Sequence, residues 1–170
     1  MAIAKGQSIK MLPRTQINQM PLAFHMAMAG LAGLLIAAMI AYGGSAEGLW
    51  PVIIGLGFIF SLSWLFSTMF VEVSDQGVKW HFRWKLFGGF IPVAEIREAE
   101  VKYLGWQVGY GHRWTKHGTL YRAWGLDVVQ IHRQKSKPVF LGASDAAAMV
   151  RAIEAMQEVW LEQNILNLGN

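Results

Sequence analysis

The sequence predicts a membrane α-helical hairpin followed by an all-β barrel of about seven strands, which a C-terminal amphipathic α-helix closes. Three observations carry this prediction. Two apolar segments near the N-terminus are long enough to span a bilayer, short runs of alternating apolar and polar residues follow them, and the C-terminal segment returns to helical spacing.

The composition separates the chain from ordinary soluble domains. Of its 170 residues, 54% are hydrophobic and only 15% are charged, whereas soluble domains carry about 25% charged residues. Disordered and collagen-like classes are therefore excluded. The chain has no cysteine, which also excludes disulfides, thiolate metal sites and cysteine nucleophiles.

The two apolar segments define the domain organisation. Residues 22–42 and 50–70 are 21 residues each, about 31 Å as helices, which matches a hydrocarbon core of about 30 Å. Their short connector predicts an antiparallel transmembrane hairpin over 22–70, between an N-terminal tail (1–21) and a C-terminal domain (71–170). The alternative is a signal peptide cleaved at the connector, but signal-peptide cores are only about 7–15 residues long.

Charges around the hairpin predict its orientation. Six cations lie on the tail and domain sides of the two segments, namely Lys5, Lys10, Arg14, Lys79, Arg83 and Lys85. The connector carries only Glu47. The positive-inside rule therefore predicts a multi-pass protein of the inner (cytoplasmic) membrane with both termini in the cytoplasm. The polar tail is expected to be mobile unless something holds it.

Small residues recur every four positions along one face of each apolar segment. They are Ala29, Gly33, Ala37 and Ala41 in the first, and Gly57 and Ser61 in the second. Such faces let helix backbones approach closely within lipid. Two interpretations follow: the small faces pack the hairpin against itself, or they dock on another membrane protein.

Beyond the hairpin, the hydrophobic pattern has a period of two. Val78–Trp84 alternates apolar and basic residues, and turn signals such as 74–77 and 134–138 separate similar runs. We predict an antiparallel barrel or sandwich of seven short strands near 68–73, 78–85, 89–92, 97–104, 117–123, 126–133 and 138–142.

The C-terminal segment has the spacing of an amphipathic helix. Met149, Ile153, Met156 and Trp160 form one apolar stripe. Ser144 is the expected N-cap, and Asp145 is expected in the first turn. This helix is predicted to close one end or side of the barrel.

Four segments resemble a known family: VEVSDQGVKW (71–80), FIPVAEIREAE (90–100), GYGHRWTKHGTLYRAWG (109–125) and VFLGASDAAAMVRAI (139–153). They resemble bacterial pleckstrin-homology-like (PH-like) domains attached to transmembrane hairpins, in which a V-S-D-x-G turn and a G-T-L-Y strand recur. The resemblance implies a PH-like barrel over roughly 68–158. It concerns structural motifs, and the fold generally serves binding rather than catalysis.

Motifs of catalysis and metal binding are missing from the sequence. It lacks H-E-x-x-H, the P-loop and G-x-S-x-G. His112 and His117 have no carboxylate between them, and the glutamates at 95, 98 and 100 suit a solvated strand face. We therefore expect no enzyme activity, no catalytic residue and no metal or cofactor. The one alternative is His25, within the first apolar segment, as a ligand of haem or a pigment.

Cations and aromatic residues concentrate between residues 101 and 137. This predicted basic and aromatic surface comprises Lys102, Arg113, Trp114, Lys116, Arg122, Arg133, Lys135 and Lys137. It suits anionic lipid headgroups or a protein surface, although scattered charge that keeps a domain soluble is the simpler explanation. Nucleic acid is disfavoured because the cations are dispersed and the chain is tethered to a membrane.

These features predict an accessory, scaffold or assembly subunit of a larger integral membrane protein complex. A related PH-like domain occurs in an assembly protein of purple-bacterial reaction centres, so photosynthetic or respiratory complexes are the partners that this analogy implies. The alternative is a self-standing membrane-anchored module whose PH-like domain binds lipid or protein.

Overall fold

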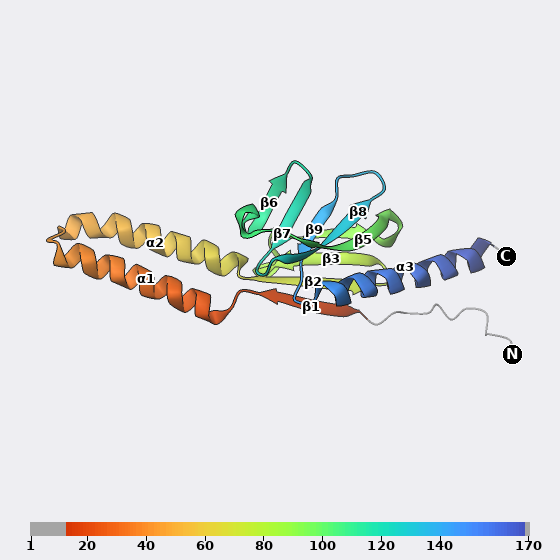
Figure 1. The fold of residues 1–170 in the computed structure, drawn as a ribbon, viewed down its shortest axis with the longest axis horizontal. Coiled ribbons are helices and arrows are strands. Elements are labelled where there is room, and N and C mark those ends of the chain that lie inside the picture. The colour runs from red at the N-terminus through yellow and green to blue at the C-terminus, as the bar shows by residue number, and fades with distance from the viewer. Residues whose placement is uncertain (1–12, 169–170) are drawn as a thin grey trace.

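The structure, a computed structural model, describes residues 13–168, and the predictions for residues 1–12 lie outside this range. Strand β1 (Arg14–Gln19) leads into helices α1 (Leu22–Ala41) and α2 (Ala46–Phe66), and helix α3 (Ala146–Leu168) ends the described chain. Figure 1 shows the α1–α2 hairpin leaving one end of a β domain, with the C-terminal end of α3 at the opposite end.

Eight strands lie between the hairpin and α3. They are β2 (Thr68–Ser74), β3 (Gly77–Phe82), β4 (Gly89–Pro92), β5 (Ile96–Tyr103), β6 (Gly111–Thr115), β7 (Gly118–Arg122), β8 (Asp127–Arg133) and β9 (Val139–Gly142). Three short 3₁₀ turns interrupt the connections, η1 (Arg83–Lys85), η2 (Val93–Glu95) and η3 (Trp106–Val108). Together with the helices these strands make an α+β fold.

The strands form two sheets, with the orders β1-β2-β3-β4 and β5-β8-β9-β7-β6. All seven predicted strands are present, but the described chain has nine, because β1 and β6 were not predicted. The expected antiparallel arrangement is wrong at one place, since β7 and β9 pair in parallel. Over residues 13–168 no strand pair joins the two sheets, so the closed PH-like barrel stays a prediction.

The main core lies where the two sheets and α3 meet. Fully buried side chains from all three layers contribute, including Val71, Phe82, Ile131, Leu141 and Ile153. A smaller cluster of Leu120, Val128 and Phe140 lies on the other face of the second sheet. Apolar residues at every second strand position supply these layers, as the period-two pattern requires.

The second apolar helix begins and ends earlier than predicted. It begins at Ala46 rather than residue 50, because the Ser45 side chain caps it by accepting a hydrogen bond from the Gly48 amide at 3.3 Å. It ends at Phe66 rather than residue 70, because residues 68–70 pair with β1 and β3 as part of β2. The last residues of the apolar segment therefore belong to a β-strand and not to the helix.

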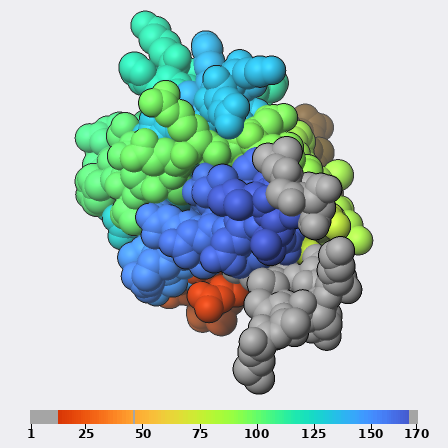
Figure 2. Space-filling view, turned by 90° about the vertical axis from the view of Figure 1, so that its right-hand side faces the viewer, coloured from red at the N-terminus to blue at the C-terminus, as the bar shows by residue number. Residues whose placement is uncertain are grey.

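Helix α3 packs through the predicted stripe: Met149, Ile153 and Met156 are buried, and Trp160 is partly buried against the core. The predicted N-cap is wrong by one residue. The Asp145 carboxylate accepts the Ala148 amide at 2.8 Å, whereas the Ser144 hydroxyl donates to the Gln16 side chain at 3.4 Å. Figure 2 shows α3 lying across the end of the domain that faces away from the hairpin.

Candidate interaction surfaces

Both hairpin helices are long and apolar enough to cross a membrane, with a mean hydropathy of 2.0 over Leu22–Ala41 and over Glu47–Phe66. Partly buried positions at helical spacing form one stripe on each helix, which we call the hairpin seam. The seam comprises Met28, Ala32, Ile36 and Met39 of α1, and Leu49, Val52, Leu56 and Ser63 of α2. These stripes have helical spacing, so they mark where the two helices contact.

The predicted small-residue faces lie outside this seam. Ala29, Gly33, Ala37 and Ala41 are all exposed, as are Gly57 and Ser61. A Cβ atom added at Gly33 or Gly57 would meet nothing within 4 Å. The Ser61 hydroxyl donates back to the Gly57 carbonyl at 2.8 Å. This geometry argues against packing of these faces within the hairpin.

His25 is packed between the helices at the domain end of the hairpin. Its side chain is buried, with Nδ1 3.3 Å from the Pro21 carbonyl oxygen. The rings of Phe60 and Trp64 meet its ring edge-to-face, at centroid distances of 6.4 and 5.6 Å. These aromatic rings cover the imidazole, whereas its Nε2 is buried without a hydrogen-bond partner among residues 13–168. His25 as a ligand of haem or a pigment therefore stays a prediction.

The predicted basic and aromatic surface is dispersed over the β domain. Lys102 lies on β5 and hydrogen-bonds Gln130, whereas Arg113, Trp114 and Lys116 lie on β6 and the turn after it. Arg133 donates to the Lys137 carbonyl at 2.8 Å, next to Lys135 in the β8–β9 turn. Figure 1 shows that this turn projects away from the hairpin. These cations therefore do not gather on one membrane-facing surface.

Arg122 does not belong to the surface at all, which corrects the prediction. Its side chain is 0% exposed, and its guanidinium donates to the carbonyl oxygens of Leu104 at 2.9 Å and Gly109 at 3.1 Å. The guanidinium also lies 4.7 Å from the Tyr110 ring. Residues 104–110 cover this face of β7, and the burial lowers the pKa of Arg122. The residue holds a loop in place.

Two aromatic contacts that the sequence analysis missed join the hairpin to the domain. On the α1 side, Phe24 packs on Trp124 at 5.4 Å, and Trp124 stacks on Tyr110, also at 5.4 Å. On the α2 side, Phe66 packs on Phe87 at 5.2 Å. The aromatic residues were visible in the sequence, but their partners lie far apart along the chain, so only the fold reveals these contacts.

Strand β1 supplies a third link between the hairpin and the domain. The Asn18 side chain is buried, accepts the amides of Ala123 and Trp124 at 3.1 and 2.7 Å, and donates to the Trp124 carbonyl at 3.0 Å. Gln16 bonds the backbone at Asp145, before α3. The part of the polar tail that the structure describes is thus held by the domain.

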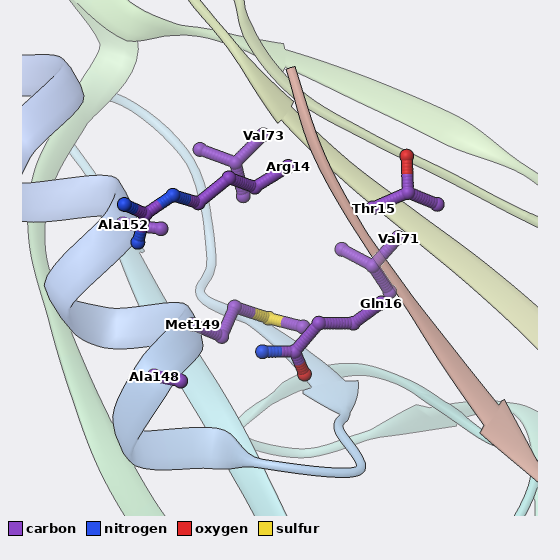
Figure 3. Close-up of a pocket in the computed structure, with 8 residues that line it drawn as sticks. All are labelled: Arg14, Thr15, Gln16, Val71, Val73, Ala148, Met149 and Ala152. Carbon is purple, nitrogen blue, oxygen red and sulfur yellow. The ribbon is translucent and has the colours of Figure 1, made fainter. Parts of the chain in front are cut away.

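A groove with a volume of about 270 Å³ opens between β1 and α3. Figure 3 shows Met149 of α3 and Gln16 of β1 facing each other across it, with the Arg14 guanidinium beside Ala152. The full lining is Arg14, Thr15, Gln16, Val71, Val73, Ala148, Met149 and Ala152. Arg14 is the one titratable side chain of this lining, so the groove offers no acid–base pair.

His112, His117 and His132 have different surroundings in the β domain. His112 stacks on Tyr121 at 4.7 Å, and burial lowers its pKa, which favours the neutral ring. His117 is exposed in the turn after β6, and Glu100 contacts His132 at 3.2 Å. Across residues 13–168, no three His, Asp or Glu side chains gather closely enough to hold a metal ion.

Comparison with known proteins identifies no relative of this chain. The chain matches no protein-family model, no curated protein and no solved structure. The resemblance to PH-like domains therefore stays a prediction from the quoted motifs.

Proposed function

We propose that the protein is a non-catalytic accessory or assembly subunit anchored in a membrane by its α1–α2 hairpin. It docks on a partner integral membrane protein through the small-residue face of α1, formed by Ala29, Gly33, Ala37 and Ala41. The observation that carries this proposal is the exposure of that face beside a hairpin seam built from other residues. Helices in lipid associate through close backbone packing at such faces.

The fold supports a hairpin whose two ends share one side of the membrane. Strand β1 precedes α1, and strand β2 follows α2, yet all six residues of β1 pair with β2, from Arg14↔Val73 to Gln19↔Thr68. Both ends of the hairpin are therefore held in one sheet. The cations next to these ends favour the cytoplasmic side.

The alternative, a module that binds lipid through the basic and aromatic surface, is less well supported. It requires those residues to act together near the bilayer. Arg122 is instead buried, and Lys135 and Lys137 lie on a turn that points away from the hairpin. The PH-like resemblance leaves photosynthetic or respiratory complexes as the partner class to be examined first.

The docking proposal is tested by adding bulk to the small face. Gly33→Leu leaves the hairpin seam intact, because no atom lies within 4 Å of a Cβ at this position. We expect recovery of partner subunits in mild detergent, measured by quantitative mass spectrometry, to fall about tenfold, which corresponds to about 1.4 kcal/mol of docking free energy.

The matched control is Ala27→Leu, which adds bulk on the opposite flank of the α1 seam, since successive helical residues turn by about 100°. Ala27 is also exposed. This variant is expected to retain the partner, and both variants must insert in the membrane at normal levels. Equal recovery of partner subunits with Gly33→Leu and the unmodified protein would rule out docking through this face.

A further inference from the structure

We propose that the β3–β4 loop, residues 83–88, is an interfacial membrane anchor that inserts Trp84 and Leu86 into the headgroup region of the bilayer crossed by the hairpin. The proposal rests on the membrane-spanning hairpin proposed above. It goes further because it assigns a direct lipid contact to the β domain, at a site separate from the small-residue face of α1.

The loop lies at the end of α2, where the chain leaves the apolar hairpin. The Phe66 ring of α2 contacts the Phe82 ring at 5.1 Å and the Phe87 ring at 5.2 Å. The Arg83 guanidinium lies 4.5 Å from the Trp64 ring and donates to the Thr68 hydroxyl at 2.8 Å. The loop is therefore held at the depth where a membrane-spanning α2 reaches the bilayer surface.

The loop exposes large apolar side chains at this depth. Trp84 is 73% exposed, Leu86 44% and Phe87 49%. Adjacent exposed apolar side chains on a soluble domain mark an interaction surface. Tryptophan favours the membrane–water interface, because its ring is amphipathic, and Trp and Leu together are typical of segments that lie in the headgroup boundary.

The charge around the loop favours a phospholipid surface as the occupant. Residues 77–94 contain Lys79, Arg83 and Lys85 and no acidic residue, and Lys85 is exposed. Basic side chains at this level attract anionic headgroups. A bilayer with anionic lipid therefore satisfies both the apolar and the basic side chains, and it is adjacent because the hairpin crosses it.

The backbone of the loop holds these bulky residues in an unfavourable conformation. Trp84, Lys85 and Phe87 have φ values of 59°, 59° and 47°, a left-handed region that glycine occupies at lower cost. The Leu86 carbonyl accepts the Phe82 amide at 3.0 Å and closes the loop. These large side chains are both strained and exposed, which fits a role in contacts with a surface outside the domain.

A second exposed tryptophan lies in the segment between β5 and β6. Trp106 of η3 is 72% exposed, in the segment that Arg122 holds against β7. The same segment reaches α1 through the Tyr110–Trp124–Phe24 contacts. Trp84 and Trp106 would together give the domain two lipid contacts.

The test uses single cysteines, because the chain has none of its own. The purified full chain carries a nitrobenzoxadiazole label at Leu86→Cys, in liposomes of phosphatidylcholine and phosphatidylglycerol. Lipid-borne nitroxide and aqueous iodide serve as quenchers. We expect nitroxide quenching at 86 to exceed that at Ser136→Cys, on the exposed β8–β9 turn, by about twofold or more.

A label at Ile54→Cys, on the exposed side of α2, separates failure of the anchor from failure of the hairpin. Quenching of position 54 by nitroxide and of position 86 by iodide alone overturns the anchor and leaves the hairpin standing. Quenching of position 54 by iodide overturns the membrane span and the anchor with it. Protection of position 86 only in native membranes, not in liposomes, would assign the loop to a protein partner and also overturn the proposal.

Two tryptophan variants test whether side-chain chemistry drives the insertion. Trp84→Ser is expected to reduce the nitroxide quenching of the label at position 86 about twofold. Trp114→Ser is the matched control, since Trp114 is 83% exposed on β6, outside the proposed anchor. Equal quenching in both variants would overturn the role of Trp84.

Discussion

Arg122 joins β7 to the segment 104–110 through side-chain hydrogen bonds to residues that are distant in the sequence. Its donors reach the carbonyl oxygens of Leu104, Gly105 and Gly109. A buried cation is tolerated when its charge is met by such acceptors and by an aromatic face, here that of Tyr110. Gly142 lies next to the Arg122 side chain, and a Cβ atom at position 142 would come 3.0 Å from that side chain. The glycine therefore leaves room for the arginine.

Replacement of Arg122 by methionine tests this role at a similar side-chain length. The carbonyl groups of 104, 105 and 109 lose their donor, and an unsatisfied buried polar group costs about 1–3 kcal/mol, so Arg122→Met is expected to destabilise the domain by about 3 kcal/mol. The measurement is urea unfolding of the detergent-solubilised chain. Arg113→Met, on the neighbouring strand and exposed, is expected to stay within about 0.5 kcal/mol; similar losses for both would contradict the role of Arg122.

At the scale of elements, β1 extends the sheet and ties the hairpin to the domain. Four of its six residues are exposed, and it lies at the edge of the first sheet. Besides its backbone pairing with β2, its hold on the domain depends chiefly on the buried Asn18 side chain, together with the Met20 amide, which donates to the Ser67 carbonyl at 2.8 Å.

Asn18→Ala is expected to loosen β1. The amides of Ala123 and Trp124 both lose their acceptor, at a cost of about 2–3 kcal/mol. Protease cleavage near residue 14 of the reconstituted protein should accelerate, and the domain should unfold at a lower temperature. Gln16→Ala is the control, because its bonds to Asp145 and Ser144 are exposed and solvent replaces them. Cleavage at the rate of the unmodified protein in Asn18→Ala would show that other contacts hold the strand.

At the scale of the whole molecule, pairing of β1 with β2 means that the hairpin tip and the β domain lie at opposite ends. Figure 1 shows the tip at one extreme and the domain toward the other. Tyr42 is 92% exposed at the tip, and Lys135 is exposed in the β8–β9 turn. If the hairpin spans the membrane, these two residues lie on different sides of it.

Cysteines at the two positions test this topology in intact cells. A membrane-impermeant thiol reagent is expected to label Tyr42→Cys and to leave Lys135→Cys unlabelled, because the positive residues near the domain favour the cytoplasm. Labelling after cell lysis controls for reactivity at both sites. The reverse pattern would place the β domain in the other compartment, and labelling of both would contradict a membrane span.

The sequence by itself determined those elements whose signal is local. Two apolar segments of helical length, seven strands with period two and the Met149–Trp160 stripe all follow from short-range periodicity, because burial on one face of an element repeats with the geometry of that element. The polar strand β1 and the short strand β6 were not predicted, because each has a single buried residue and so carries little apolar alternation.

Only the tertiary structure decided which side chains act together. The parallel β7–β9 pair, the burial of Arg122 under residues 104–110 and the exposure of Gly33 outside the hairpin seam all depend on segments distant in sequence. The same holds for the β3–β4 loop. Only the contact between the Phe66 and Phe87 rings shows that Trp84 and Leu86 lie beside the end of α2. Charge and hydrophobicity can be read from a sequence, but desolvation depends on what covers a side chain, and long-range packing decides that.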